Sequence, residues 1–209
     1  MRAVVFGGGG FAREVAAFLK EHSTFTVTGF VVTKIEKTEQ GGIPFIAEDV
    51  FWEKGSASYC DVAFVAIGAT GIRSKIVERL KQSGVKLPTF IHPTASFSNS
   101  VSIGQASIVY PHVSATAGVS IGEGVLLNSG CTIGHDSVLG DFVNLNPGTH
   151  VAGNVRIGAR AFIGIGASVL ENITIGEDAT IGGGAMVIDD LAAGVVAVGI
   201  PAKVIKGKA

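Results

Sequence analysis

Aliphatic residues recur at every sixth position through the second half of the chain. From residue 103 to residue 187 this series holds Ile, Leu or Val at fourteen of fifteen places, and alanine at the other. The series is Ile103, Val109, Ala115, Ile121, Leu127, Ile133, Leu139, Leu145, Val151, Ile157, Ile163, Val169, Ile175, Ile181 and Val187. A small or β-branched residue, such as Val119, Cys131 or Ala167, lies two positions before each of them, and glycine follows at eight places. Each six-residue unit therefore predicts one short strand, whose two apolar residues point to the same side, and one turn.

The period predicts a triangular coil of parallel strands. Three units close a coil of 18 residues, and successive coils stack about 4.8 Å apart through backbone hydrogen bonds. Residues 101–190 hold five such coils without an interruption, so no long loop is expected to protrude. Because one coil cannot bury its own apolar face, the stability must come from stacking.

The first half of the chain alternates between apolar strands and amphipathic helices. Strands are predicted over residues 2–6, 25–32, 61–68 and 87–91, and helices over residues 11–22 and 72–82. This alternation indicates a small parallel sheet in an α/β domain. We expect that domain to span residues 1–92, and an all-β prism with a C-terminal tail to span residues 93–209.

Composition and charge narrow the classes of function. The chain has 209 residues, of which 47% are hydrophobic and 16% charged, with a net charge of −1. These values exclude an intrinsically disordered chain and give no basic field for nucleic acid. Residues 101–190 carry two basic and eight acidic groups and no lysine, whereas the last 19 residues carry three lysines. No stretch approaches the ~20 apolar residues of a membrane span, so membrane insertion is not expected.

The two cysteines and the N-terminal residues indicate in which cellular compartment the protein is expected. Cys60 and Cys131 lie far apart and have neither metal nor redox spacing. Such cysteines are typical of a reducing cytosol, where they pack as small hydrophobic residues. The apolar run at the N-terminus is too short for a signal peptide. We therefore expect a cytoplasmic protein that needs no metal.

A glycine-rich turn follows the first predicted strand. The pattern Gly7-x-Gly9-x-x-Ala12 is the relaxed form of a turn whose backbone N–H groups and following helix meet phosphate. NAD binding also requires an acid at the end of the second strand, where this chain has Val32-Thr33-Lys34. Two interpretations are favoured over NAD: the diphosphate of a nucleotide sugar, and a tight turn that binds nothing.

One histidine of five is a candidate for catalysis. His135 follows Gly134 at a turn of the repeat and is followed by Asp136, a carboxylate that can orient and support an imidazole base. The alternative is a solvated pair without a role. Zinc prisms need three converging histidines, but His112, His135 and His150 are 23 and 15 residues apart and do not stack at multiples of 18.

The repeat and several motifs resemble a known family. The stretches GGGGFAREV (7–15), VAIGATGIRSKI (65–76), GHDSVLGDF (134–142), GNVRIG (153–158) and GIPAKVI (199–205) resemble the hexapeptide-repeat nucleotide-sugar acetyltransferases. The similarity is greatest to the UDP-4-amino-sugar N-acetyltransferases, with sialic acid O-acetyltransferases and perosamine N-acetyltransferases as cousins. It implies a Rossmann-like N-terminal domain, a left-handed parallel β-helix, a homotrimer, and acetyl-CoA as co-substrate for acetylating a nucleotide-linked amino sugar in bacterial surface glycan biosynthesis.

The resemblance also implies roles for individual residues. His135 takes the place of the catalytic base and Asp136 that of the acid that orients it. Acetyl-CoA contacts fall on Asn144, Ile165 and Gly183. Contacts to the nucleotide sugar fall on Gly9, Gly10, Phe11 and Gly68, and on Thr33 and Lys34, which replace the acid pair of the UDP-sugar enzymes. For Lys203 and Lys206, contact with coenzyme phosphates and a solvated tail both stay open.

Two other functions remain open at this stage. His135 can serve as a base for a hydroxyl acceptor as well as for an amine, so O-acetylation of a sialic acid is an alternative. The second alternative is a non-catalytic trimeric scaffold, in which both the glycine turn and the His-Asp pair would occur by chance and have no function.

Overall fold

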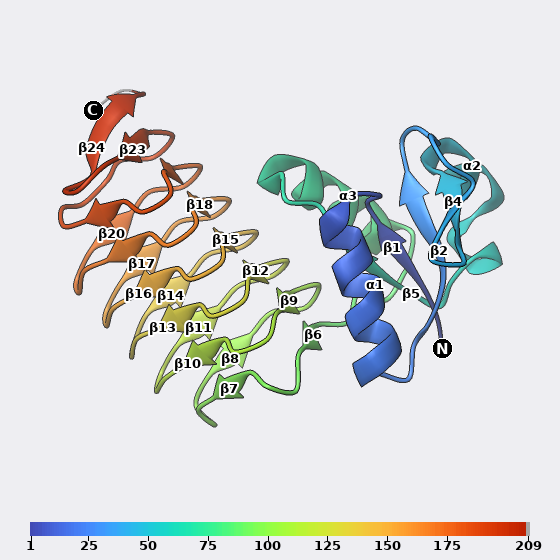
Figure 1. The fold of residues 1–209 in the computed structure, drawn as a ribbon, viewed down its shortest axis with the longest axis horizontal. Helices are drawn as coiled ribbons and strands as arrows, with labels where there is room; N and C mark the ends of the chain where they lie inside the picture. Colours follow the sequence, from blue (N-terminus) through green and yellow to red (C-terminus); the bar gives the residue numbers. More distant parts are fainter. Residues whose placement is uncertain (208–209) are drawn as a thin grey trace. The chain divides into compact units, whose positions relative to one another are not determined.

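The computed structural model describes residues 1–207. The chain divides into two compact units, Met1–Phe90 and Ile91–Ala209, coloured blue to green and green to red in Figure 1. The expected boundary, residue 92, lies two residues beyond this division.

The first unit is built on a five-stranded sheet. Its strands are β1 (Arg2–Phe6), β2 (Thr26–Val32), β3 (Glu39–Gln40), β4 (Ile43–Ala47) and β5 (Val62–Val65), in the order β3-β4-β2-β1-β5. The helices are α1 (Gly10–His22), α2 (Glu48–Lys54) and α3 (Thr70–Gln82), with a 3-10 turn, η1 (Ser56–Ser58). Strands β1, β2, β4 and β5 run parallel, which confirms the predicted small parallel sheet, while the edge strand β3 is antiparallel to β4.

The core of this unit follows from its apolar runs. Strand β5 is buried throughout and β1 is buried after its first residue, as expected for central parallel strands. Helix α1 buries Ala12, Val15, Ala16 and Leu19, which are spaced three and four residues apart on one face.

Strands β3 and β4, helix α2 and the turn η1 of the first unit were missed from the sequence. Strand β4 contains Pro44, which cannot donate to a ladder, and short apolar runs with proline rarely indicate a strand. Pro44 is tolerated because β4 lies near the sheet edge, opposite the two-residue strand β3. Helix α2 has seven residues, too few to show a helical period.

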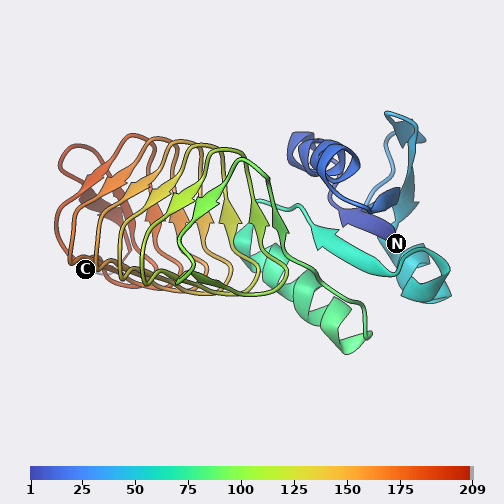
Figure 2. The ribbon, with the colours of Figure 1, turned by 90° about the horizontal axis from the view of Figure 1, so that it is seen from below.

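The second unit is a prism whose strands have two residues each, except the last two, and its stacked rungs are visible in Figure 2. The strands are β6 (Phe90–Ile91), β7 (Ser96–Phe97), β8 (Ser102–Ile103), β9 (Ile108–Val109), β10 (Ser114–Ala115), β11 (Ser120–Ile121), β12 (Leu126–Leu127), β13 (Thr132–Ile133), β14 (Val138–Leu139), β15 (Asn144–Leu145), β16 (His150–Val151), β17 (Arg156–Ile157), β18 (Phe162–Ile163), β19 (Ser168–Val169), β20 (Thr174–Ile175), β21 (Thr180–Ile181), β22 (Met186–Val187), β23 (Val196–Val198) and β24 (Lys203–Lys206). From β7 to β22, each strand residue pairs with the strand residue 18 positions away, as Ser114 does with Thr132. The three faces of the prism are sheets of six, five and eight strands.

The prism starts before the first repeat found in the sequence and ends in an antiparallel pair of strands that the repeat does not predict. Phe90–Ile91 is the first strand of the eight-stranded sheet, so the expected strand 87–91 contributes to the prism. After β22 the six-residue spacing is lost, and β24 returns antiparallel along β23. This hairpin ends the parallel stacking.

The interior of the prism is a single apolar column. The aliphatic residue of each unit from Val109 to Val187 is buried, together with the small residue two positions earlier, such as Val119 or Ala167. Residues of the left-handed backbone conformation recur 18 positions apart at the turns, as at Gly118, Asp136 and Asn154. The repeat therefore fixes both what is inside and where the turns lie.

Candidate active site

His135 and Asp136 form a hydrogen-bonded pair on a turn of the prism. The turn follows β13 and leads into β14, and both side chains are more than 60% exposed. His135 Nδ1 lies 3.0 Å from Asp136 Oδ2. Because a carboxylate only accepts hydrogen bonds, this contact assigns the proton to Nδ1 and leaves Nε2 free to accept one. The pair has the geometry of an oriented base.

Backbone bonds hold this turn between the coils on either side. Asp136 adopts a left-handed conformation with φ of 59° and donates its N–H to Ala117 O at 2.9 Å. In the next coil, Asn154 donates its N–H to His135 O at 2.8 Å. An exposed dyad thus stands on a backbone that is fixed from both sides.

Ser137 adds a buried side-chain tie that the sequence did not reveal. Its hydroxyl is fully buried, donates to Ala152 O at 2.9 Å and accepts from Val155 N at 3.1 Å. Ser107 makes the equivalent bonds to Gly122 and Val125 in an earlier coil. The hydroxyl thus connects the turn of the dyad to the coil that follows.

Two glycines leave room for the dyad. A Cβ added at Gly153 would lie 2.5 Å from His135 Nε2, and one added at Gly118 would lie 2.5 Å from Asp136 Oδ1. Gly153 does not have a positive φ, so the imidazole, and not backbone conformation, is what requires glycine there. Neither glycine belonged to the site predicted from the sequence, and the signal that points to them is the 18-residue offset from His135 and Asp136.

The residues expected to contact acetyl-CoA lie elsewhere on the prism. Ile165, on the turn after β18, is 61% exposed, and a Cβ added at Gly183 would lie 3.2 Å from Ile165 O. These two residues are therefore neighbours at one corner, while His135 occupies the next corner. Asn144, on β15, is only 4% exposed. One prism brings together His135 with Asp136 and Ile165 with Gly183, but not the two pairs with each other.

Two other histidines of the prism, His92 and His150, have local side-chain contacts. His92 is buried, and its Nδ1 lies 2.9 Å from Thr94 Oγ1. His150 Nδ1 lies 2.9 Å from Thr132 Oγ1 in the preceding coil. Among residues 1–207, no group of three or more His, Cys, Asp or Glu side chains is placed to hold a metal ion.

In the first unit, the glycine turn lies where parallel strands diverge. Strand β1 is central, β2 and β4 continue on one side and β5 lies on the other, so the turns after β1 and β5 meet at a switch point, where α/β folds bind ligands. Gly7 has φ of 120°, and a Cβ there would lie 2.6 Å from Ala66 O. This glycine is required by the close approach of the two turns.

The next glycines are not required by anything in the chain. A Cβ added at Gly9, Gly10 or Gly68 would meet no atom within 4 Å, and none of the three has a positive φ. Gly9 is the N-cap residue of helix α1 and makes no side-chain capping hydrogen bond, because glycine has no side chain. Open glycines at an uncapped helix start form a cradle that suits an anion.

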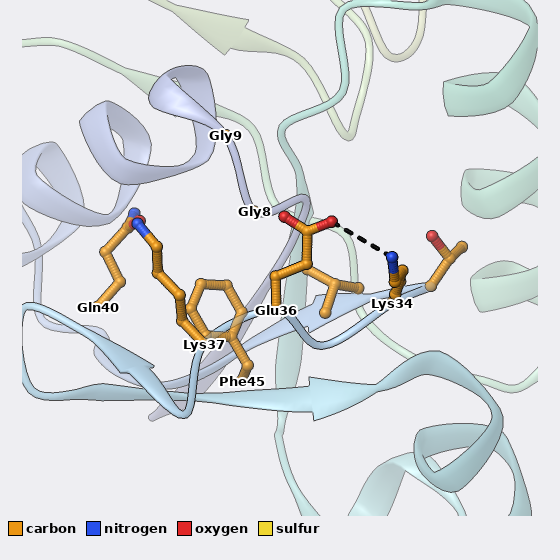
Figure 3. Close-up of a pocket in the computed structure, with 9 residues that line it drawn as sticks. Gly8, Gly9, Lys34, Glu36, Lys37, Gln40 and Phe45 are labelled. Carbon is orange, nitrogen blue, oxygen red and sulfur yellow. Dashed lines mark ion pairs between the residues drawn. The ribbon is translucent and has the colours of Figure 1, made fainter.

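Two cavities adjoin this turn and share Gly8, Val32 and Thr33. One has a volume of about 440 Å³ and is lined by Gly8, Gly9, Val32, Thr33, Lys34, Glu36, Lys37, Gln40 and Phe45 (Figure 3). The other, of about 350 Å³, is more apolar and is lined by Phe6, Gly7, Gly8, Val31, Val32, Thr33, Glu48, Ile67, Ile72, Lys75 and Ile76.

The predicted substrate residues divide around these cavities. Gly9, Thr33 and Lys34 line the larger one, whereas Gly10, Phe11 and Gly68 line neither. The sequence analysis missed four other residues that line the larger cavity. Gln40 lies on β3 and Phe45 on β4, and Glu36 and Lys37 lie just before β3; neither strand was predicted.

A buried arginine supports the turn after β5. Arg73 is fully buried on α3, and its Nη1 donates to Ile67 O at 2.7 Å. Burial lowers the pKa of the Arg73 guanidinium to about 9, since the interior disfavours the charge. The bond fixes the backbone next to Gly68.

Both cysteines are buried, and neither contributes to the candidate site. Burial raises the pKa of the Cys60 and Cys131 thiols to about 11. They are therefore protonated at neutral pH and unreactive in the folded protein.

Comparison with known proteins decides the family. The model of the PglD N-terminal domain matches residues 2–80, and that of the bacterial transferase hexapeptide, with six repeats, matches residues 154–189. The acetyltransferase domain of PglB from Neisseria gonorrhoeae, solved with acetyl coenzyme A, is 34% identical, with a TM-score of 0.91, and the match covers 98% of each chain. The chain belongs to the PglD-like hexapeptide-repeat acetyltransferases.

Other members of this acetyltransferase family extend the comparison. A variant of perosamine N-acetyltransferase from Caulobacter crescentus, solved with CoA and GDP-perosamine, is 33% identical, with a TM-score of 0.90 over 100% of this chain and 98% of that one. WeeI from Acinetobacter baumannii is 28% identical, with a TM-score of 0.87 over 98% of this chain and 100% of that one. A search of curated protein sequences returned no match.

These similarities confirm several sequence predictions for the PglD-like chain. The fold class, an α/β domain followed by a left-handed parallel β-helix of hexapeptide repeats, is confirmed. The enzyme class, acetyltransferase, is confirmed as well. The relatives hold acetyl-CoA or CoA, the expected co-substrate. No helix in the described part of the chain is long and apolar enough to cross a membrane.

Proposed function

We propose that this acetyltransferase transfers the acetyl group of acetyl-CoA to the amine of a nucleotide-linked amino sugar, in bacterial surface glycan biosynthesis, with His135 as general base. The observation that carries the proposal is the His135–Asp136 pair, joined at 3.0 Å on an exposed turn. It supplies an oriented proton acceptor with open access, which is the group that this reaction requires.

The proton transfers follow from the geometry of the pair. Asp136 accepts from Nδ1, which leaves His135 Nε2 to take the proton of the amine as the new nitrogen–carbon bond forms. As the carbon–sulfur bond breaks, the coenzyme leaves as a thiolate and takes the proton from the His135 imidazolium, which restores the neutral base. Asp136 also stabilises the imidazolium that exists between these two steps. General-base assistance of this kind contributes about 10²–10⁴-fold to the rate.

The glycine turn of the first unit is the proposed site of the nucleotide diphosphate. Gly9, Gly10 and Gly68 leave space that no protein atom fills, beside an uncapped helix start. Phe11, Thr33 and Lys34 complete the proposed substrate contacts. Thr33 and Lys34 lie in the segment between β2 and β3 and line the larger cavity. A bound GDP-perosamine in the Caulobacter relative supports an acceptor of this class.

The proposed coenzyme contacts favour a homotrimer. His135 and Ile165 lie at different corners of one prism, and a three-fold arrangement brings one corner of a prism toward a different corner of its neighbour. Acetyl-CoA would then bind between two subunits, with Ile165 and Gly183 on its path and Asn144 as a further contact. The tail residues Lys203 and Lys206 are exposed on β24. This exposure is compatible both with contact to coenzyme phosphates and with a solvated tail.

The test is the release of free thiol from acetyl-CoA, with a panel of nucleotide-linked 4-amino sugars and free sialic acid as acceptors. We expect turnover with an amino sugar, and a loss of 10²-fold or more in kcat for His135→Ala, with acetyl-CoA binding retained. His22→Ala is the matched control, because His22 lies at the far end of α1 from the glycine turn. The buried cysteines keep the thiol background low.

Each other outcome identifies a different error. Full activity in His135→Ala would refute the assignment of the base. Turnover with sialic acid alone would indicate an O-acetyltransferase. Failure to bind acetyl-CoA at all would indicate a scaffold.

A further inference from the structure

The larger cavity of the first unit is lined by polar and charged side chains of both signs, whereas a diphosphate alone would require only donors and positive charge. Lys34, Glu36 and Lys37 come from the segment between β2 and β3, and Gln40 from β3 itself. Lys34 Nζ lies 3.7 Å from Glu36 Oε1, and both side chains are at least 75% exposed. Figure 3 shows this ion pair on one side of the Phe45 ring, with Lys37 and Gln40 extending from the other. The arrangement places a carboxylate, two ammonium groups and an amide, which both donates and accepts, around an aromatic ring.

Phe45 provides an aromatic surface for a flat ligand. Its ring packs against Phe30, with ring centroids 5.5 Å apart and planes inclined by 34°, and it is only half-buried, so part of it faces the cavity. Stacking on an aromatic side chain tolerates any base, because each base has a π-face. Selection among bases must therefore come from the polar groups.

Gln40 has an unused donor at this cavity. Its Nε2 atom is buried, and within residues 1–207 no hydrogen-bond partner faces it. A buried amide nitrogen without a partner is costly, and a ligand carbonyl in the cavity would remove that cost. Gln40 therefore indicates that an acceptor atom of a ligand belongs here.

The Glu36 carboxylate requires a hydrogen-bond donor on the ligand, whereas the Gln40 amide nitrogen requires an acceptor. A carboxylate accepts hydrogen bonds and donates none. Guanine has two adjacent donors on one edge, N1–H and the 2-amino group, next to the acceptors O6 and N7, which lysine side chains favour. Uracil and thymine have one N–H between two carbonyls that would repel a carboxylate. In adenine and cytosine, a ring acceptor stands beside the exocyclic amine.

We propose that this cavity selects a guanine nucleotide, with Glu36 accepting from N1–H and the 2-amino group, and Lys37 and Gln40 donating to O6 and N7. The inference rests on the proposed function, since it presumes a nucleotide-linked acceptor, and it adds the base and the residue that recognises it. Glu36 is thereby a specificity-determining residue, distant in sequence from the proposed catalytic pair.

The test is calorimetric binding of nucleoside diphosphates to the full chain. GDP is compared with IDP, which lacks only the 2-amino group, and with UDP, CDP, ADP and 2′-deoxyguanosine diphosphate. A bidentate base contact discriminates by about 5- to 140-fold, and we expect five- to tenfold because Glu36 is exposed. Glu36→Gln should make GDP and IDP bind equally, whereas the matched control Glu39→Gln, three residues away and outside the lining, should keep the preference.

Three results would overturn the proposal, and one of them also separates it from the proposed function. Equal binding of GDP and UDP to the unmodified chain would refute guanine selection and leave a nucleotide-linked acceptor intact. A uniform loss for all ribonucleotides in Glu36→Gln, with 2′-deoxyguanosine diphosphate unaffected, would assign Glu36 to the ribose. Acetyl-CoA binding without binding of any nucleoside diphosphate would refute this inference and the proposed acceptor together. Unchanged melting temperatures verify that both variants fold.

Discussion

Glycines in the two units of the chain are kept for different reasons. In the prism, a Cβ added at Gly134 would lie 2.5 Å from Ala152 C, and one at Gly140 would lie 2.7 Å from Ala159 N. Both obstacles are backbone atoms of the next coil, which cannot rotate away. In the first unit, Gly9, Gly10 and Gly68 would meet nothing within 4 Å.

This difference separates fold from function within one residue type. The backbone of the next coil leaves no room for a Cβ at Gly134 or Gly140, so glycine at these two positions is a condition of folding. At the uncapped start of α1, the fold would accept alanine, so the empty space indicates room for a ligand. Substitutions to alanine in the two places should therefore fail in different assays.

The largest expected effect is on folding, for Gly140→Ala in the prism. The added methyl group meets the Ala159 backbone at 2.7 Å, and overpacking against an atom that cannot move destabilises by about 3 kcal/mol. Urea unfolding measures this loss. Gly71→Ala on α3 is the matched control, since its Cβ would meet no atom within 4 Å. Equal stability of the two variants would contradict the steric account.

Gly153→Ala should lower kcat about tenfold or more and leave folding nearly intact. Its Cβ would lie 2.5 Å from His135 Nε2, and an imidazole can rotate away from it, unlike a backbone atom. The ring would then leave its contact with Asp136. Steady-state kinetics and thermal unfolding, measured together, distinguish this result from general destabilisation. An unchanged kcat would show that His135 does not need its present position.

Gly10→Ala in the first unit should raise stability and weaken acceptor binding, the opposite of the folding defect expected for Gly140→Ala in the prism. Replacing a helical glycine with alanine stabilises by up to about 1 kcal/mol where space allows, as it does here. The same methyl group should weaken binding of the nucleotide-linked acceptor about tenfold, while the KM for acetyl-CoA stays the same. A variant that is neither more stable nor weaker in acceptor binding would show that the open space has no ligand.

The smallest expected effect is at the surface ion pairs of the prism. Arg160 donates to Asp178 and Glu177 at 2.7 to 2.8 Å, and the Arg160 guanidinium lowers the pKa of the Asp178 carboxyl. A lowered carboxyl pKa stabilises the fold above its unfolded value of about 3.9, and this stabilisation is lost as the pH falls through the folded pKa. Arg160→Met should cost under about 1 kcal/mol at pH 7, and nothing once Asp178 is protonated. Unfolding measured at pH 7 and at an acid pH below the lowered pKa of Asp178 checks both values.

The sequence was most informative where structure repeats. Each inward residue from Val109 to Val187 could be predicted, because a six-residue period leaves one arrangement that buries every aliphatic side chain. The first unit has no period, and strand β4 was missed because Pro44 is tolerated only by virtue of its place near the sheet edge. Because β3 and β4 were missed, Gln40 and Phe45, two of the nine residues that line the larger cavity, were missed as well.

Local sequence placed His135 beside Asp136, because adjacent residues on a fixed turn need no long-range folding to meet. It also determined the prism, since periodicity alone decides which side chains are buried. Only the tertiary structure showed that Ser137 ties that turn to the next coil and that Gly153 leaves room for the imidazole. Only the tertiary structure gathered Glu36, Gln40 and Phe45 around one cavity. The prism contacts join neighbouring coils, and the cavity joins the segment of Glu36, Gln40 and Phe45 to Gly8 and Gly9. Their positions therefore depend on how coils stack and strands pair.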